Sequence, residues 1–172
     1  MRSDAELVTA VLGGDRGAFA DIVRRYERTV RIIARSFVPD HHTAEDVAQE
    51  TFLAAYRKLG SLRSGAALGA WVARIARRQA VQLGRRASAA ATAELVVDPP
   101  AGTARLDDES RRLLAEVWDL PSHERAVVMM RYFERRSAGE IAEILDRPVG
   151  TVTKQLSRAY ERLRQRIREG QQ

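Results

Sequence analysis

The stretch SAGEIAEILDRPVGTVTKQLSR, residues 137–158, determines the fold of the C-terminal part of this chain. Ser137 followed three residues later by Glu140 is a capping box, which predicts a helix over residues 138–145. A tight turn comes next, and a second, longer helix is predicted over residues 149–168. A short capped helix, a turn and a longer helix form the helix-turn-helix pattern, whose second helix enters the major groove of DNA.

The second of these helices has an apolar and a polar side. Apolar residues recur at helical spacing and are predicted to pack inward: Val152, Leu156, Ala159, Leu163 and Ile167. The polar side then carries Thr151, Lys154, Gln155 and Arg158, and a basic surface continues through Arg162, Arg164, Arg166 and Arg168. Arginine and lysine suit the acceptors of guanine, and glutamine suits adenine. An ordinary helical hairpin with a solvated face is the alternative, and the coincidence of cap, turn and polar side favours DNA recognition.

Upstream of this motif, two further helices are predicted over residues 111–119 and 121–133, the second with Pro121 at its start. The segment 87–110 is rich in Ala, Ser and Thr, contains a Pro-Pro pair and lacks periodic large apolar residues, which predicts a flexible linker. The predicted fold is therefore all-α, with two small helical domains, residues 1–86 and 111–172, joined by the linker.

The N-terminal domain is predicted to contain four helices. The first covers residues 4–12, and the second has apolar residues at helical spacing from Phe19 to Phe37 and stops at Pro39. Thr43 is predicted to cap a third helix that ends near Leu59. The fourth is predicted over residues 66–85, with Leu68, Trp71, Val72, Ile75 and Ala76 on its buried side.

The third helix carries a cluster of acidic and amide side chains. Asp46, Gln49 and Glu50 are spaced i, i+3 and i+4, so they share one face of the helix. Paired carboxylates can perform acid–base chemistry, but no nucleophile, metal cluster or Gly-rich phosphate loop accompanies them. A solvated face is the simplest alternative, and a docking face for a basic partner is the functional interpretation.

The fourth helix has the opposite charge. From Trp71 onward it is basic and contains no acidic residue, with arginines at positions 74, 77, 78, 85 and 86. Basic side chains beside an aromatic ring suit single-stranded or distorted DNA, through phosphate contacts and base stacking. For Trp71 itself, packing in the core explains most of its surface. The preceding loop, residues 61–65, can hold an extruded base.

The amino-acid composition favours some classes of protein over others. The net charge of +6 favours a polyanionic partner, and the absence of cysteine excludes disulfides and fits a reducing cytoplasm. The three histidines lack metal-ligand spacing, no cofactor motif is present, and neither a signal peptide nor a membrane-spanning run is found. An enzyme is therefore the least favoured class.

Two sets of motifs in this chain resemble those of extracytoplasmic-function (ECF) sigma factors of bacterial RNA polymerase. The first set resembles their second conserved region and comprises GD at 14–15, AF at 18–19, RY at 25–26, AEDVAQETF at 44–52, YRKL at 56–59 and WVARIA at 71–76. The second resembles their fourth region and comprises LP at 120–121, EIAEIL at 140–145, PVGTV at 148–152 and LSRA at 156–159. The resemblance covers nearly the whole chain except the linker.

The resemblance implies a role for each surface. Asp46, Gln49 and Glu50 would bind the clamp helices of the polymerase β′ subunit, and the apolar side of the second domain would dock on the β flap. The −10 promoter element would be recognised and melted by Ser61, Leu62, Arg63, Ser64, Trp71, Arg74, Arg77 and Arg78. The −35 element would be read by Thr151, Thr153, Lys154, Gln155 and Arg158. An anti-sigma factor is a further expected partner.

Several positions depart from the pattern of that family. Its members usually carry an aromatic residue at the position of Leu68 and asparagine at that of Arg78, often aspartate at that of Gln82, and phenylalanine at that of Leu62. The run Thr153–Gln155 replaces a common basic pattern. Unusual promoter preference is therefore expected. A stand-alone helix-turn-helix regulator remains an alternative, as does a sigma-like protein that binds polymerase without initiating.

Overall fold

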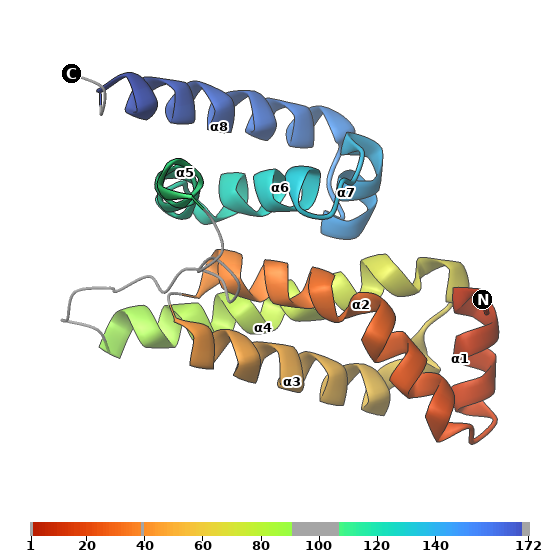
Figure 1. The fold of residues 1–172 in the computed structure, drawn as a ribbon. Helices are drawn as coiled ribbons and strands as arrows, with labels where there is room; N and C mark the ends of the chain where they lie inside the picture. Colours follow the sequence, from red (N-terminus) through yellow and green to blue (C-terminus); the bar gives the residue numbers. More distant parts are fainter. Residues whose placement is uncertain (1, 39, 91–106, 170–172) are drawn as a thin grey trace.

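The computed structural model describes residues 2–38, 40–90 and 107–169, and their regular structure is entirely helical, as predicted. The first domain contains α1 (Asp4–Leu12), α2 (Arg16–Phe37), α3 (His41–Lys58) and α4 (Leu68–Ala90), with short 3-10 turns η1 (Leu59–Ser61) and η2 (Gly65–Ala67) before α4. The second domain contains α5 (Asp108–Trp118), α6 (Ser122–Tyr132), α7 (Ala138–Leu145) and α8 (Val149–Glu169). Figure 1 shows the second domain lying along one side of the first.

Short polar side chains set where most of these helices begin. Ser3, Asp15, Asp40, Asp107 and Ser137 each accept a hydrogen bond from a backbone N–H in the first turn of the following helix. The predicted cap of the third helix was wrong, because that helix starts at His41 and its cap is Asp40. Thr43 instead donates its backbone N–H to Asp40 Oδ1 at 2.8 Å and its hydroxyl to Oδ2 at 2.7 Å.

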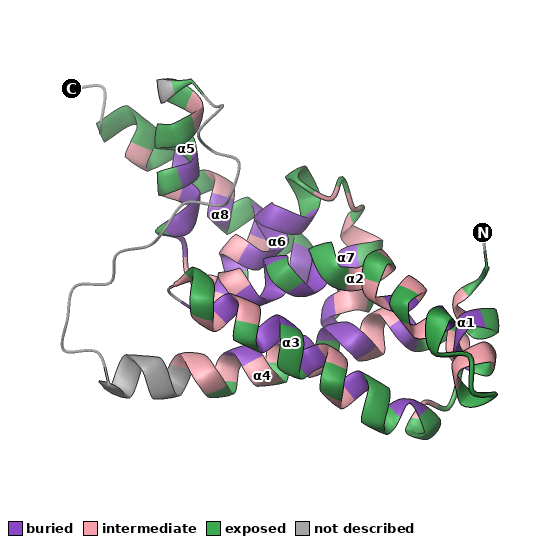
Figure 2. Ribbon diagram, turned by 60° about the horizontal axis from the view of Figure 1, so that its bottom comes forward, coloured by how far each residue is buried: buried purple, intermediate pink, exposed green. Residues whose placement is uncertain are grey.

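The first domain is built on the apolar sides of α2, α3 and α4, with α1 packed across one end. Figure 2 shows these helices buried on one side and exposed on the other. Ile22, Ile33, Leu68 and Val72 are completely enclosed at the centre. At the other end of the domain, a Cβ on Gly84 would lie 2.6 Å from the carbonyl oxygen of Phe37, so a larger residue there would push α4 away from α2.

The second domain encloses Leu120, Met130, Ile141 and Val152. The predicted inward face of the last helix is confirmed for Val152, Leu156, Ala159 and Leu163, which are all buried. Ile167 was predicted to pack inward and is instead 41% exposed, in the last turn of α8 before that helix ends at Glu169.

Both ends of the predicted linker are helical. Helix α4 continues to Ala90 through an alanine-rich segment that favours helix, and α5 begins at Asp108, capped by Asp107. The predicted linker of residues 87–110 is therefore helical at both ends. The rest of it, residues 91–106, lies outside the described residues, as does the predicted helix stop at Pro39.

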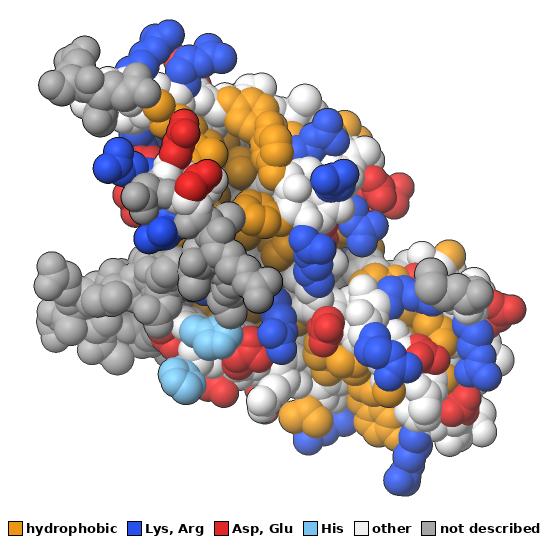
Figure 3. Space-filling model, in the orientation of Figure 1, with side chains coloured by type: hydrophobic (Ala, Val, Ile, Leu, Met, Phe, Trp, Pro, Cys, Tyr) orange, Lys and Arg blue, Asp and Glu red, His pale blue; other side chains and the backbone are white. Residues whose placement is uncertain are grey.

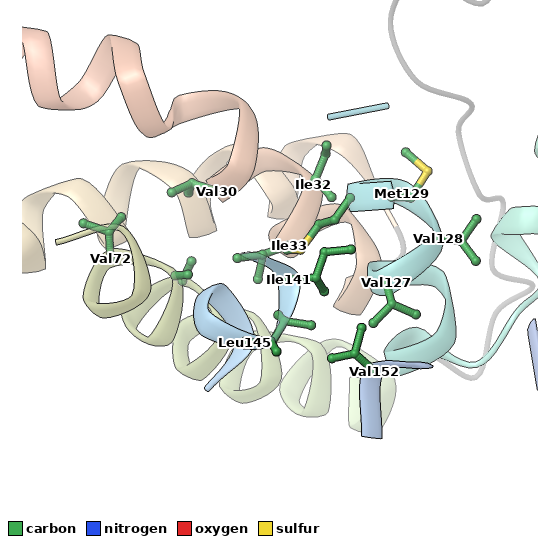
Figure 4. Packing of buried hydrophobic residues seen from close by; sticks show 14 of the residues in the cluster. Val30, Ile32, Ile33, Val72, Val127, Val128, Met129, Ile141, Leu145 and Val152 are labelled. Carbon is green, nitrogen blue, oxygen red and sulfur yellow. The ribbon is translucent and has the colours of Figure 1, made fainter. Parts of the chain in front are cut away.

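The two domains share one continuous apolar core. Helix α2 packs against α6, and α4 packs against α7. In Figure 4, Ile32 and Ile33 of α2 lie close to Met129 of α6 and Ile141 of α7, and all four belong to one cluster of buried residues. The expected pair of helical domains is present, and the structure adds that they are packed on one another.

Candidate functional site

Helix α3 presents the predicted acidic face to solvent. Asp46, Gln49 and Glu50 are all exposed, while Val47, Thr51 and other residues on the opposite side of the helix are buried. Neither Asp46 nor Glu50 forms an ion pair with another described residue. The neighbouring carboxylate of Glu45, in contrast, lies 3.2 Å from Arg31. The face therefore keeps two carboxylates available to a basic partner.

Leu53 extends this face by one turn and was missed by the sequence analysis. Its side chain is 46% exposed, and it follows Glu50 by three residues, so both lie on the same side of α3. An apolar residue at that spacing on an otherwise polar helix face is the signal that identifies it. An exposed leucine beside two carboxylates gives the face an apolar as well as an electrostatic component.

The loop between η1 and α4 is exposed on one side and packs against the first domain on the other. Ser61, Arg63 and Ser64 are exposed, whereas Leu62 is half-buried and packs against the core. A Cβ on Gly65 would lie 2.5 Å from Cα of Ala5 in α1, so only glycine allows this close approach. The loop is therefore anchored at Leu62 and Gly65, and the side chains of Ser61, Arg63 and Ser64 are accessible to a ligand.

Helix α1 is in turn fixed on α2 by polar contacts. Arg25 Nη1 lies 2.5 Å from Asp4 Oδ1, and the Tyr26 hydroxyl donates to the same carboxylate. Burial and the hydrogen bond to Asp4 raise the pKa of Tyr26, so its hydroxyl stays protonated at neutral pH. These contacts support the loop indirectly, through α1.

Helix α4 carries the predicted aromatic and basic side chains along one stretch. Trp71 is half-buried and packs against the core, as predicted for most of its surface. Arg74 and Arg78 are exposed and lie one turn apart. Arg77 is half-buried, and its Nε is enclosed without a hydrogen-bond partner. The described part of α4 therefore has two exposed guanidinium groups, of which that of Arg74 lies 3.3 Å from Asp146, and one that is partly covered.

The helix-turn-helix motif has the predicted local geometry. The capping box is formed, with the Glu140 N–H donating to Ser137 Oγ at 3.2 Å and the Ser137 N–H donating to Glu140 Oε2 at 2.8 Å. Asp146 ends α7 in the left-handed conformation, at φ 53°, which aspartate tolerates better than most residues. The capping hydrogen bonds with Ser137 lower the pKa of Glu140, which is ionised at neutral pH.

Helix α8 exposes most of the residues predicted to read DNA. Thr151, Lys154 and Arg158 form an exposed stripe, and Thr153 is exposed with its hydroxyl donating to the carbonyl of Val149 at 2.6 Å. Gln155 was predicted to face outward but is half-buried, and its Oε1 is enclosed without a partner. It precedes the buried Leu156 and lies at the edge of the packed side of the helix.

Two of the four arginines predicted to form a basic surface in the second half of α8 are instead ion-paired within the domain. Arg162 Nε lies 3.1 Å from the carboxylate of Glu124, which is 2% exposed, and Arg166 lies 3.3 Å from Glu116 and 3.1 Å from Asp119. These two arginines therefore tie α8 to α5, to α6 and to Asp119, which follows α5. Arg164 and Arg168 are exposed as predicted and form no ion pair with another described residue, so together with Lys154 and Arg158 they leave unpaired positive charge along α8.

The second domain also has an apolar groove of about 500 Å³ between α5, α6 and α8. Figure 3 shows hydrophobic side chains gathered over this part of the molecule. Leu113, Tyr132 and Phe133 on its rim are 40–60% exposed. Tyr160 packs edge-on against Tyr132, and burial, followed by a hydrogen bond with Tyr132, raises the pKa of Tyr160 to about 12. Exposed aromatic and leucine side chains around a groove are typical of a protein-binding surface.

Within the described residues, no group of three or more His, Cys, Asp and Glu side chains is arranged to hold a metal ion. None of the described helices is long and apolar enough to cross a membrane.

Comparison with known proteins identifies both domains. Residues 22–90 match the family Sigma-70 region 2, and residues 110–163 match Sigma-70, region 4. These matches place the chain in the class of sigma-70-type transcription initiation factors.

Curated relatives match over almost the full length of the chain. The chain is 34% identical to the ECF RNA polymerase sigma factor SigM of Mycobacterium tuberculosis, covering 94% of this chain and 83% of that protein. It is 31% identical to the ECF RNA polymerase sigma factor SigW of Bacillus subtilis, with 94% and 95% covered. The chain belongs to the ECF family of sigma factors.

Solved structures show the same fold. CnrH in complex with the cytosolic domain of CnrY aligns with a TM-score of 0.73 at 25% identity, covering 98% of this chain and 99% of the other. The sigma factor RpoE from Bartonella quintana, in complex with the anti-sigma factor NepR, aligns with a TM-score of 0.63 at 26% identity, covering 86% and 97%.

Proposed function

We propose that this chain is the promoter-directing subunit of a bacterial RNA polymerase, acting in the cytoplasm and contributing binding rather than catalysis of its own. The observation that carries the proposal is the exposed, unpaired acidic face of α3 on a chain whose net charge is +6. A face that contacts only solvent does not require unpaired carboxylates, whereas a face that docks on a basic partner does. Asp46 and Glu50 form no ion pair with another described residue and so meet this requirement.

In this proposal, Asp46, Gln49 and Glu50 bind the clamp helices of the β′ subunit, with Leu53 as an apolar contact beside them. The apolar groove of the second domain receives the β flap, because its rim of leucine and aromatic side chains suits an amphipathic partner segment. Two separate contacts with one polymerase would strengthen binding by raising the effective concentration of each.

Promoter DNA would be bound by both domains. The exposed side chains of the loop, Ser61, Arg63 and Ser64, together with Arg74 and Arg78 of α4, are proposed to contact the −10 element. Leu62, Trp71 and Arg77 would line the same surface. Lys154 and Arg158 of α8, with Thr151 and Thr153, are proposed to reach the −35 element in the major groove, and Gln155 would need a rotamer change to do so.

An anti-sigma factor is a proposed regulator. One similar structure is the sigma factor RpoE in complex with the anti-sigma factor NepR, and another is CnrH in complex with the cytosolic domain of CnrY. The similarity to these structures covers both domains of this chain. A regulator that contacts both domains of a sigma factor is therefore proposed to bind the corresponding surfaces of this chain.

The first experiment is an equilibrium measurement of binding to bacterial core RNA polymerase. Replacing Glu50 by Ala should weaken binding by roughly tenfold, because hot-spot contacts contribute about 1–2 kcal/mol each. Glu27→Ala is the matched control, since Glu27 is exposed on α2, away from the acidic face, and should leave the affinity unchanged.

Circular dichroism melts of both variants should match that of the wild-type chain, because neither side chain contributes to the core. Loss of structure in Glu50→Ala would contradict the assignment of a binding role. A folded wild-type chain that does not bind core polymerase would favour a stand-alone DNA-binding regulator instead.

A further inference from the structure

The contact between the two domains includes a buried polar pair. The hydroxyl of Thr29 in α2 donates to the carboxylate of Glu134, with oxygen–oxygen distances of 3.0 and 3.1 Å. Thr29 is 4% exposed and the Glu134 side chain is 5% exposed, so water does not compete for this contact. Beside it, Arg28 donates to the carbonyl oxygen of Phe133. Hydrogen bonds that involve a buried carboxylate are among the stronger ones in proteins.

A second contact joins the helix-turn-helix motif to the helix proposed to bind the −10 element. Arg74 Nη2 of α4 lies 3.3 Å from Asp146 Oδ2, at the turn between α7 and α8. Next to this pair, burial, and then the positive charge of Arg77, lower the pKa of Arg147. The contact between α4 and the turn thus includes an exposed ion pair. The Thr29–Glu134 and Arg28–Phe133 hydrogen bonds, with Arg35 of α2 lying over the ring of Trp118, add polar attraction between the domains, and Glu134 also pairs with Arg136 at 3.7 Å.

Promoter geometry is incompatible with this arrangement. The names of the two elements place them about 25 base pairs apart, which is roughly 85 Å along a duplex with about 34 Å per turn. In the structure, α4 touches α7 of the helix-turn-helix motif. A chain with its domains in contact therefore cannot bind both elements of a straight promoter at once.

The covalent connection allows the domains to separate. The backbone between Ala90 and Asp107 spans at most about 60 Å when fully extended, at roughly 3.3–3.6 Å per residue. The helices proposed to bind DNA add their own length, because α8 alone has 21 residues, or about 30 Å. The chain between the domains is therefore long enough for them to separate, and separation exposes the apolar residues that they share, such as Ile32 and Met129.

We infer that Phe133 and Glu134 form a latch on α2 that keeps the free chain closed, with the helix-turn-helix motif covering part of the −10-binding helix. This inference rests on the proposed function, and it assigns that function a regulatory contact within the chain itself. Only open molecules bind DNA, so the apparent affinity for DNA equals the affinity of the open form multiplied by the fraction of molecules that are open. Weakening the latch raises that affinity without changing any residue that contacts DNA.

The test uses the full-length chain with two introduced spin labels. The sequence contains no cysteine, so Glu27→Cys in α2 and Glu161→Cys in α8, both exposed, give a unique labelled pair. The latch variant is Glu134→Lys, which places a cation beside Arg28 in a turn outside the helices. Glu109→Lys, exposed on α5, makes the same change in charge away from the domain contact and is the matched control.

Pulsed electron paramagnetic resonance should give one narrow distance for the closed wild-type chain and for Glu109→Lys. Glu134→Lys should give a longer and broader distribution. Affinity for a random-sequence single-stranded DNA of about 16 nucleotides should rise by about tenfold in Glu134→Lys and much less in Glu109→Lys.

Two outcomes would overturn the latch. One is a Glu134→Lys chain with the same narrow distance as the wild-type chain. The other is a chain that opens while its DNA affinity matches that of Glu109→Lys. Failure of the proposed function is distinguishable, because it appears as loss of core polymerase binding by the wild-type chain, whatever the interspin distances are.

Discussion

Arg158 and Arg162 lie one helical turn apart on α8, and the structure assigns them different surroundings. Arg158 is exposed, and its neighbours on the stripe are Thr151 and Lys154. Arg162 is partly exposed but neutralises Glu124, a carboxylate that is almost completely buried. A buried carboxylate without a partner is costly, so Arg162 is expected to stabilise the domain whereas Arg158 is free to bind DNA.

Replacing Arg158 by Ala should therefore impair promoter-specific transcription and leave stability unchanged. Each lost base contact is expected to cost about 1–3 kcal/mol of discrimination. Arg162→Ala is the matched comparison and should lower the free energy of unfolding by about 1–3 kcal/mol. Transcription from the mapped promoter and urea unfolding measure the two effects. Equal promoter selectivity of Arg158→Ala and the wild-type chain would show that the assigned helix face is wrong.

At the scale of single residues, the sequence predicted which residues lie on the exposed side of a helix better than it predicted the burial of residues at the boundary between the two sides. Thr151, Lys154 and Arg158 are exposed as the helical period requires, because their spacing places them opposite buried Val152 and Leu156. Gln155 lies at the boundary between the two sides, where periodicity alone does not decide burial. Thr29 and Glu134 were not identified, because a contact between residues 105 positions apart leaves no local pattern.

At the scale of the helices, carboxylates at the N-termini make stability depend on pH. Asp15, Asp40 and Asp107 accept backbone hydrogen bonds as caps, and Glu6 and Glu140 complete capping boxes. In each case the folded state holds the pKa below its ordinary value of 3.8 or 4.5, chiefly through backbone N–H donors or, for Asp15, through Arg2 first. The stabilisation is thus fully present above those ordinary values and is lost as the pH falls through the lowered ones.

The melting temperature should accordingly be constant from pH 7 to about 5 and fall as the pH drops further through about 4 to 3. Thermal melts followed by circular dichroism at a series of pH values measure this dependence. Glu140→Gln should melt at a lower temperature at pH 7 and lose less on acidification. A wild-type melting temperature that is equal at pH 6 and pH 3 would contradict the role of these caps.

Helix positions were largely predictable, and helix ends less so. Apolar residues at helical spacing identified α2, α4 and α8, because one side of each helix must be buried. The ends of the linker were placed too far outward, since alanine-rich sequence after Arg86 is compatible with either state and extends α4 to Ala90. The third helix, capped by Asp40 rather than by Thr43, shows the same limit: two residues with capping side chains lie three positions apart, and the sequence does not rank them.

At the scale of the whole molecule, the packing of the domains was not predictable from the sequence. Charge and motif order predicted two separate modules on a tether, and each module was correctly expected to be helical. Ile32 on α2 and Met129 on α6 are apolar residues that either domain alone could bury. In the structure they belong to one cluster that crosses between the domains, together with Ile141 of α7 (Figure 4).

A continuous core predicts cooperative unfolding. Because burial of apolar surface at the domain contact contributes to both domains, calorimetry of the wild-type chain should show a single transition. Glu134→Lys, which weakens the contact, should split it into two, with the less stable domain melting first. For domains of this size a loss of 1 kcal/mol lowers the melting temperature by about 4–8 °C.

Glu109→Lys separates this effect from a general change in charge and should keep the single transition of the wild-type chain. Two transitions already present in the wild-type chain would mean that the domains unfold independently, and the contact between α2 and α6 would then contribute little to stability. A single transition in all three chains, with Glu134→Lys merely shifted, would instead show that apolar packing couples the domains without the polar pair. The polar contact then only adjusts how often they separate, and the interspin distances measure that adjustment directly.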